Sequence, residues 1–459
     1  MPKGYGAVMC SHVAAPYLPQ ATVLQRYAHE HYPEWKAARA ALREPVPFVV
    51  QRDIDLFLQC RDPGLGHATV ACGECGFTRD LWYSCKRRWC PWCGTRRMHE
   101  RAKAAIDVFA GYPVRHWIGC LPNPLRYGMG YDPDLVTGGV NAFVNAIFHH
   151  QVWQAKAAFN LTSVNLALTS AATFIHRVSA DLSTNVHFHV ISLDGVLTED
   201  AASGSLVFRR LDPPTPEEIA AVAQRMCRKT CTMLERRGYW HPTHDDTEAG
   251  SVEGTLTLPG WRPERATFHG EAAQDPKDGK KPRAGIAFNV HATRSVEASD
   301  RDELEQLVRY VLAPPVADRQ LSVDRDGNMV VQLKRSRYDG STEIAYDPHQ
   351  LLDRIAALVH RPRARLIRLH GVAAPNSRVR RMAYHEREQG SPNRIRQTNQ
   401  HRQQLEEARA KLFLYARYAA DRVLSCPVCL NRMHLVAIDS PRFKYRNPRW
   451  IHPDTPIES

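Results

Sequence analysis

The stretch NVHFHVISLDGV, residues 185–196, places two histidines in an apolar run that ends at an Asp-Gly pair. Side chains two apart on a β-strand point the same way, so His187 and His189 share one face and their apolar neighbours fill the other. Two imidazoles roughly 6–7 Å apart along a strand can converge on one cation. The alternative, a pair of partly exposed histidines on an edge strand, is less favoured because of the apolar flanks. The Asp194-Gly195 pair is typical of a hairpin turn just past the histidines.

The segments around this stretch predict an α+β domain. Residues 114–121, 164–178 and 205–211 read as strands, and residues 143–159 and 215–238 as helices. We therefore expect a sheet that carries the two histidines, with helices packed against it.

A further helix is well delimited at SDRDELEQLVRYVLAPP, residues 299–315. Ser299 can cap its start, and the Pro-Pro pair ends it. Its apolar residues recur at helical spacing, and Tyr310 falls on the flank of that stripe. A phenol can act as a nucleophile on phosphate when a cation is near. The alternative is a tyrosine that only packs at the margin of a core.

The twelve cysteines include two matched pairs, Cys72-x-x-Cys75 and Cys90-x-x-Cys93, separated by 14 residues. This spacing is typical of a zinc ribbon, in which four thiolates hold a structural zinc and leave no position open for chemistry. Reduced buried cysteines are a poor alternative for two matched pairs.

Other cysteines suggest further metal ligands. Cys60, His67 and Cys85 lie in the same block and could supply most of a second zinc site. Cys426 and Cys429 form half of another knuckle, but no second pair follows them. A metal there would need ligands such as His434 or residues of another chain.

The chain of 459 residues has a formal net charge of +13, which makes a polyanionic partner plausible. Basic residues around the second cysteine pair alternate with tryptophans that could stack on unpaired bases, and further arginines follow residue 376. The alternative is a solvated basic face. The candidate DNA-binding residues are Lys86, Arg87, Arg88, Arg96, Arg97 and Arg378.

Several classes are disfavoured by what the sequence lacks. There is no apolar run of about 18 residues, as a membrane span needs, and residues 1–10 contain no signal-peptide apolar region. We therefore expect a cytoplasmic protein with no membrane partner, in which the cysteines bind metal rather than form disulfides.

Three stretches together resemble the HUH rolling-circle transposases of the insertion-sequence common-region type. They are the cysteine block CRDPGLGHATVACGECG…SCKRRWCPWC, the strand HRVSADLSTNVHFHVISLDGV, and LVRYVLAPPVADRQLS with the later VQLKRSRYDGSTEI and LHGVAAPNSR. The resemblance runs from about residue 56 to about residue 438. It implies an HUH nuclease-like antiparallel sheet with packed helices, preceded by a zinc ribbon and followed by a basic, mainly helical region.

The resemblance also assigns roles. His187 and His189 would hold one divalent cation, Mg or Mn, and Tyr310 would attack a DNA phosphodiester to leave a 5′-phosphotyrosine. Two-tyrosine relatives carry a second tyrosine where this chain has Gln306, so the chain resembles the single-tyrosine branch, and a second protomer could supply the other strand transfer. No nucleotide cofactor is needed. The third metal ligand is open among His116, His176 and Gln306.

The implied function is DNA transposition, a form of DNA recombination, in which the enzyme nicks and rejoins single strands at the ends of a mobile element and at its target. The alternatives are a plasmid or phage replication initiator with the same chemistry, or a catalytically inactive zinc-dependent DNA-binding protein. The expected domains are an N-terminal helical region at 1–55, a zinc-binding domain at 56–112, a catalytic domain at 113–345 and a basic C-terminal region at 346–459.

Overall fold

The computed structural model describes residues 21–109, 111–243, 251–259, 262–273, 287–334, 336, 339–359, 366–380, 383, 426–440 and 443–446. Most of the basic segment that follows Arg380, including a helix expected at 403–424, lies outside these residues. Within the described part of the chain, no helix has the length and apolar character to cross a bilayer.

An eight-stranded sheet forms the centre of the molecule, in the order β15-β4-β5-β3-β11-β10-β9-β8. We expected an antiparallel sheet, and the strands that carry the histidines and their neighbours are antiparallel, but β10 and β11 run parallel, so the sheet as a whole is mixed. The α+β class is confirmed. The strands are β3 (Val114–Cys120), β4 (Ser170–Val178), β5 (Thr184–Leu193), β8 (Trp240–Pro242), β9 (Ser251–Leu256), β10 (Glu264–Ala272), β11 (Ala287–Val296) and β15 (Ile367–Gly371).

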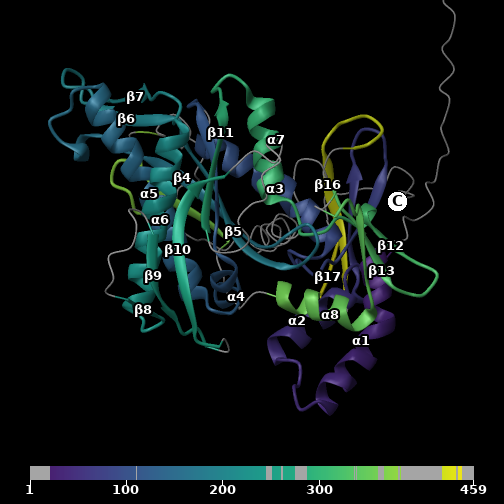
Figure 1. Cartoon of the computed structure of the whole chain (residues 1–459). Coiled ribbons are helices and arrows are strands. Elements are labelled where there is room, and N and C mark those ends of the chain that lie inside the picture. The colour runs from purple at the N-terminus through teal and green to yellow at the C-terminus, as the bar shows by residue number, and fades with distance from the viewer. Residues whose placement is uncertain are drawn as a thin grey trace, which may run out of the picture.

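Each face of this sheet is covered by its own helices (Figure 1). Helices α4 (Asn123–Tyr131), α5 (Pro133–Ala158) and α6 (Pro216–Glu235) pack on the face that carries the apolar residues of β5. Helices α3 (Pro91–Phe109) and α7 (Arg301–Leu312) share a core with the opposite face. The even-numbered residues between Val186 and Val190 are buried in the first core, as the strand pattern predicted.

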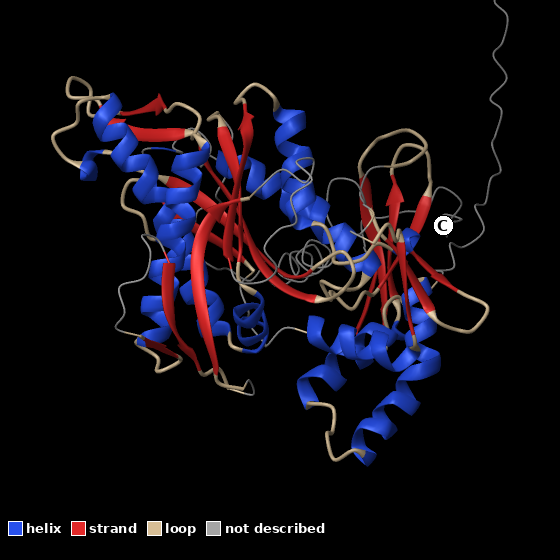
Figure 2. Cartoon of the chain, viewed as in Figure 1, coloured by secondary structure: helices blue, strands red, loops and turns tan. Residues whose placement is uncertain are grey.

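A second sheet stands beside the first (Figure 2), and its strands come from opposite parts of the chain (Figure 1). Its order is β17-β16-β1-β2, and β16 pairs antiparallel with β1. The C-terminal region that we expected to be mainly helical therefore contributes strands wherever it is described beyond residue 425. The strands are β1 (His67–Cys72), β2 (Thr78–Trp82), β16 (Met433–Ser440) and β17 (Phe443–Arg446).

One core unites the N-terminal helices with later segments. Residues of α1 (Val23–Ala41) and α2 (Phe48–Leu58) pack with α8 (Pro348–Leu358) and with a small sheet. The expected domain boundaries at residues 55, 112 and 345 stay predictions, but this core crosses all three. The small sheet contains β12 (Leu321–Val323), β13 (Met329–Gln332) and β14 (Glu343–Tyr346), and the remaining pair is β6 (Gly195–Glu199) with β7 (Leu206–Arg210).

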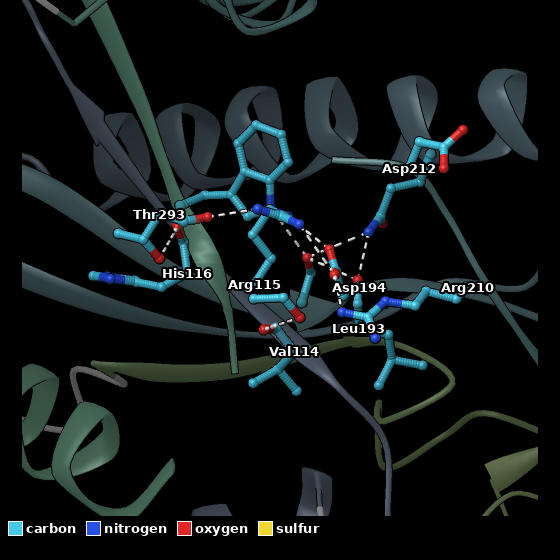
Figure 3. A network of polar contacts seen from close by, with 12 residues as sticks. Val114, Arg115, His116, Leu193, Asp194, Arg210, Asp212 and Thr293 are labelled. Atoms are coloured by element: carbon cyan, nitrogen blue, oxygen red, sulfur yellow. Dashed lines mark hydrogen bonds and ion pairs between the residues drawn. The ribbon is translucent and has the colours of Figure 1, made fainter. Parts of the chain in front are cut away.

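Asp194 does not form the hairpin turn that the Asp-Gly pair predicted. Strand β5 ends at Leu193 and β6 starts at Gly195, but β6 pairs with β7 instead of folding back on β5. The Asp194 carboxylate is buried and accepts hydrogen bonds from Arg115 Nε at 2.6 Å and Nη2 at 3.0 Å (Figure 3). Arg115 Nη1 also donates to the Thr293 carbonyl at 2.6 Å, so this ion pair joins β3, β5 and β11 next to the site.

Candidate metal and nucleophile site

Three histidines on two neighbouring strands converge on one point. His176 on β4 lies opposite His187 in the strand register, and His189 follows two residues along β5. Each offers a nitrogen, and these nitrogens lie within 4.8 Å of one another. Of the three candidates for a third ligand, the structure therefore brings His176 to the pair. The signal in the sequence that could have ranked His176 first is the short connection between β4 and β5, because strands joined in this way usually pair.

Each imidazole has one nitrogen engaged in a hydrogen bond, which leaves the other for a cation. His187 Nδ1 donates to the Asn185 carbonyl at 2.8 Å, and His176 Nε2 donates to the Val311 carbonyl at 2.7 Å. A carbonyl only accepts, so these contacts fix the tautomers and leave lone pairs on His187 Nε2 and His176 Nδ1. This is the arrangement that orients histidine ligands in metal sites.

His116 lies behind this group rather than in it. Its Nε2 is 2.8 Å from His189 Nδ1, and its side chain is buried on β3. The contact leaves His189 Nε2 for the cation. The third candidate, Gln306, is exposed on α7 one turn before Tyr310. The contact between His116 and His189 was not apparent from the sequence, because it depends on the register of β3 beside β5.

Burial keeps these imidazoles neutral, which is the form that binds metal. Burial, with the nearby His176, lowers the pKa of His187 to about 4. Burial likewise lowers the pKa of His116 to about 4 and holds the pKa of His189 far below its usual value. Burial lowers the pKa of His176 as well, so His176, His187 and His189 are all neutral and can act as ligands throughout the neutral pH range.

Tyr310 lies at the edge of the histidine group. Its ring centroid is 5.7 Å from that of His189, in an edge-on orientation, and 55% of the residue surface is exposed. The other residues of its helix behave as predicted: Leu304, Val308 and Val311 are buried. The cap differs, since Asp300 rather than Ser299 accepts a hydrogen bond from the Glu303 N–H at 2.8 Å. The phenol is thus both near the histidines and open to solvent.

The Pro314-Pro315 pair explains how α7 is tied to the histidines. The last carbonyls of a helix lack partners within it, and proline has no N–H to supply one. The Tyr310 carbonyl accepts from the Ala313 N–H at 3.3 Å, and the Val311 carbonyl accepts from His176. A candidate metal ligand therefore satisfies the carbonyl of the residue that follows the candidate nucleophile.

Helix α3 of the cysteine block supports α7 directly. Ala102, Ile106 and Phe109 share a core with the buried face of α7. At its start, Gly94 lies so close to Pro314 that an added Cβ would be 2.6 Å from the proline Cβ. A cavity of about 120 Å³ lies at this junction, and its lining includes Arg88, Arg97, His176, Pro314 and Pro315.

The cysteines form two clusters, and the grouping differs from the one that spacing predicted. Cys60, Cys85, Cys90 and Cys93 form an inner cluster, and Cys72, Cys75, Cys426 and Cys429 form an outer cluster. The two knuckles expected to share one zinc therefore belong to different clusters. His67 belongs to neither, because it packs on Trp82 and lies 3.6 Å from Asp80. Spacing could not reveal this, since the partners of Cys72 and Cys75 come from the far end of the described chain.

The inner cluster has the dimensions of a tetrahedral zinc site. Zn–S bonds of about 2.3 Å place neighbouring sulfurs roughly 3.8 Å apart. Cys93 Sγ is 3.6 Å from the sulfurs of Cys60 and Cys85, and Cys60 and Cys90 are separated by 4.0 Å. All four residues are buried at the start of α3. Their chemistry and geometry fit a structural zinc that fixes this helix.

The basic candidates have different surroundings. The Arg87 guanidinium pairs with the Asp53 carboxylate and donates to the Cys85 carbonyl at 3.0 Å, so it is engaged inside the cysteine block. Arg96 lies over the Trp92 ring at 5.3 Å. Arg378 is exposed. Lys86, Arg88 and Arg97 are partly exposed, and the last two line the cavity beside His176.

Comparison with known protein families agrees with this organisation. Residues 27–119 match a family model described as "Transposase zinc-binding domain", of the IS91 type, and residues 171–381 match one described as "Putative transposase". No curated protein and no solved structure gives a significant match. The second match spans the three histidines and Tyr310, and the first contains the whole inner cluster. The chain therefore carries an IS91-type transposase zinc-binding domain with a structural zinc site, followed by a transposase domain.

Proposed function

We propose that this transposase nicks and rejoins single DNA strands through a covalent bond to Tyr310, by the HUH mechanism of rolling-circle transposition. The observation that carries the proposal is the approach of an exposed phenol to three neutral imidazoles, one buried and two half-buried, whose free nitrogens lie within 4.8 Å of one another. A tyrosine that only packs at the margin of a core would not need to combine this exposure with this proximity to the histidines.

His176, His187 and His189 would hold the divalent cation, Mg or Mn, with one nitrogen each. A bound cation would polarise the scissile phosphate and offset the negative charge of the reaction. Three neutral nitrogen donors suit Mn better than Mg, which is a harder ion that usually prefers oxygen. His116 would orient His189, and the backbone carbonyls of Asn185 and Val311 would orient the other two.

The chemistry of the chain itself is a phosphoryl transfer in two directions. Tyr310 Oη attacks phosphorus and loses its proton, the bond from phosphorus to the 3′ oxygen breaks, and that oxygen takes up a proton as a free 3′-OH. Attack by a 3′-OH on the phosphotyrosine reverses these changes and joins the new strand. The covalent bond conserves the energy of the broken one, so no nucleotide cofactor is required.

The DNA strand would pass over the surface at the junction of α7 and the cysteine block, beside the contact between α3 and α7. Arg88 and Arg97 line the cavity beside His176 and the Pro-Pro pair, where phosphates next to the scissile bond would lie. Arg378 offers a further exposed cation. This path makes the zinc-binding domain part of the DNA-binding surface as well as the support of α7.

The decisive experiment uses a single-stranded oligonucleotide from the end of the mobile element, labelled on the 3′ side of the expected nick, with Mn or Mg. Wild-type protein should form a covalent adduct that survives denaturation and carries the label. Tyr310→Phe should form none, because the phenyl ring has no oxygen to attack phosphorus. An adduct in Tyr310→Phe would refute the assignment of the nucleophile.

A matched control separates chemistry from folding. Tyr239→Phe changes a tyrosine that packs against the core between the sheet and helices α4, α5 and α6. This variant should leave the adduct unchanged. Absence of any adduct with wild-type protein, under conditions in which it binds the oligonucleotide, would favour the inactive DNA-binding protein. An adduct only on a replication origin would favour the replication initiator.

A further inference from the structure

We infer that Cys72, Cys75, Cys426 and Cys429 bind a second structural zinc, which fastens strands β16 and β17 to the zinc-binding domain. Two of these ligands lie outside both family matches, which end at residues 119 and 381. The inference concerns these four cysteines alone and does not depend on the role of Tyr310.

The two halves of this outer cluster have the same backbone form. Cys72-x-x-Cys75 is followed by Gly76 with φ of 71°, and Cys426-x-x-Cys429 by Leu430 with φ of 61°. In each half the N–H of that last residue donates to the carbonyl of the first cysteine, at 3.1 Å for Gly76 and 3.0 Å for Leu430. Two matched turns that present four sulfurs to one point are a feature of zinc knuckles, in which thiolates reach tetrahedral geometry.

The sulfur positions fit a metal better than a disulfide. Cys72 to Cys429 and Cys75 to Cys426 are each 3.4 Å apart, and Cys75 to Cys429 is 3.6 Å. A disulfide needs about 2.05 Å, and zinc predicts roughly 3.8 Å. The Val428 N–H also donates to Cys426 Sγ at 3.4 Å, a contact that stabilises a thiolate.

The conformation of Leu430 adds an independent argument. A left-handed φ is unfavourable for a residue with a Cβ, and Leu430 recovers little of this cost by packing because 81% of its surface is exposed. A four-coordinate metal would hold the turn in this form despite the cost.

The site would close the sheet between distant parts of the chain. Cys72 ends β1, and β16 begins shortly after Cys429 and pairs along the whole of β1. Cys75 is exposed whereas the four inner cysteines are buried. The outer zinc should therefore leave first when a chelator competes for metal.

The test is the zinc content of the full-length protein, measured by elemental analysis and native mass spectrometry. Because the three histidines could also take up zinc, the readout is a difference in zinc content. Cys426→Ser/Cys429→Ser should contain one zinc ion per chain fewer than wild type, whereas Cys227→Ala/Cys231→Ala, which changes two buried cysteines of α6, should match wild type. Equal zinc contents in wild type and Cys426→Ser/Cys429→Ser would overturn the inference.

Chelator kinetics give a second readout that needs no cysteine variant. A colorimetric chelator should remove zinc from wild type in a fast and a slow phase of equal size. Leu430→Gly should slow the fast phase alone, because glycine adopts the left-handed conformation without strain. A single phase that accounts for one ion would contradict the inference even if the cysteine variants failed to fold.

Discussion

At the scale of single residues, the site depends on which nitrogen of each histidine already makes a hydrogen bond and which one is left for a cation. His189 Nδ1 faces His116, and one nitrogen of each of the other two histidines faces a backbone carbonyl. The sequence predicted that His187 and His189 share a face, because that follows from strand geometry alone. It left three candidates for the third ligand, because the register between strands is not written in the spacing of one strand.

His116→Ala should weaken the cation site without removing a ligand. Loss of a partner to a metal-bound histidine typically costs 10–100-fold in metal affinity. We expect the Mn concentration for half-maximal adduct formation to rise by that factor, while adduct formation at saturating Mn persists. His116→Gln keeps an acceptor near His189. Its Mn concentration for half-maximal adduct formation should therefore lie between those of wild type and His116→Ala. An unchanged Mn dependence in His116→Ala would show that this contact does not position His189.

At the scale of elements, α3 and α7 act as a pair. The apolar stripe of α7 was predictable from its period, and its end from the two prolines. Its partner was not predictable, because the packing of α3 on α7 depends on the chain between them. The same limit applies to Asp194. Its local sequence predicts a turn, but its carboxylate pairs with Arg115 of β3, which is distant in the sequence.

Gly94→Ala should disturb the contact between these helices. Alanine would favour the helix by up to about 1 kcal/mol, but its Cβ would lie 2.6 Å from both the Arg88 carbonyl oxygen and the Pro314 Cβ. Because the backbone must shift, we expect a net loss of about 1–3 kcal/mol in the free energy of unfolding and slower adduct formation. Denaturant unfolding and adduct kinetics measure the two effects.

A matched glycine makes that comparison informative. At Gly64 an added Cβ would meet only the Asp62 side chain, at 3.3 Å or more, so Gly64→Ala should leave the adduct rate unchanged. If Gly94→Ala had the same free energy of unfolding and the same rate of adduct formation as wild type, the close approach of Gly94 to Pro314 would not affect the position of Tyr310.

At the scale of the whole molecule, the charge of +13 favours association with DNA and makes it sensitive to salt. For single-stranded DNA, each phosphate contact contributes about −0.7 to the slope of log K against log salt concentration. Arg378→Ala should reduce the steepness by about that amount, and Arg228→Ala, exposed on α6 across the sheet, should not. Fluorescence anisotropy at several salt concentrations measures both. Equal slopes for wild type and Arg378→Ala would exclude a phosphate contact at this residue.

The link between β1 and β16 sets an order for the assembly of the chain during synthesis. Cys429 lies 357 residues after Cys72, so at 5–20 residues per second the ribosome delivers it about 20–70 s later. The histidines, Tyr310 and the inner cysteines are all made before then. Throughout that interval β1 has an unpaired edge and half a set of thiolates, so the outer cluster can be completed only after the histidine group and the inner cluster have been made.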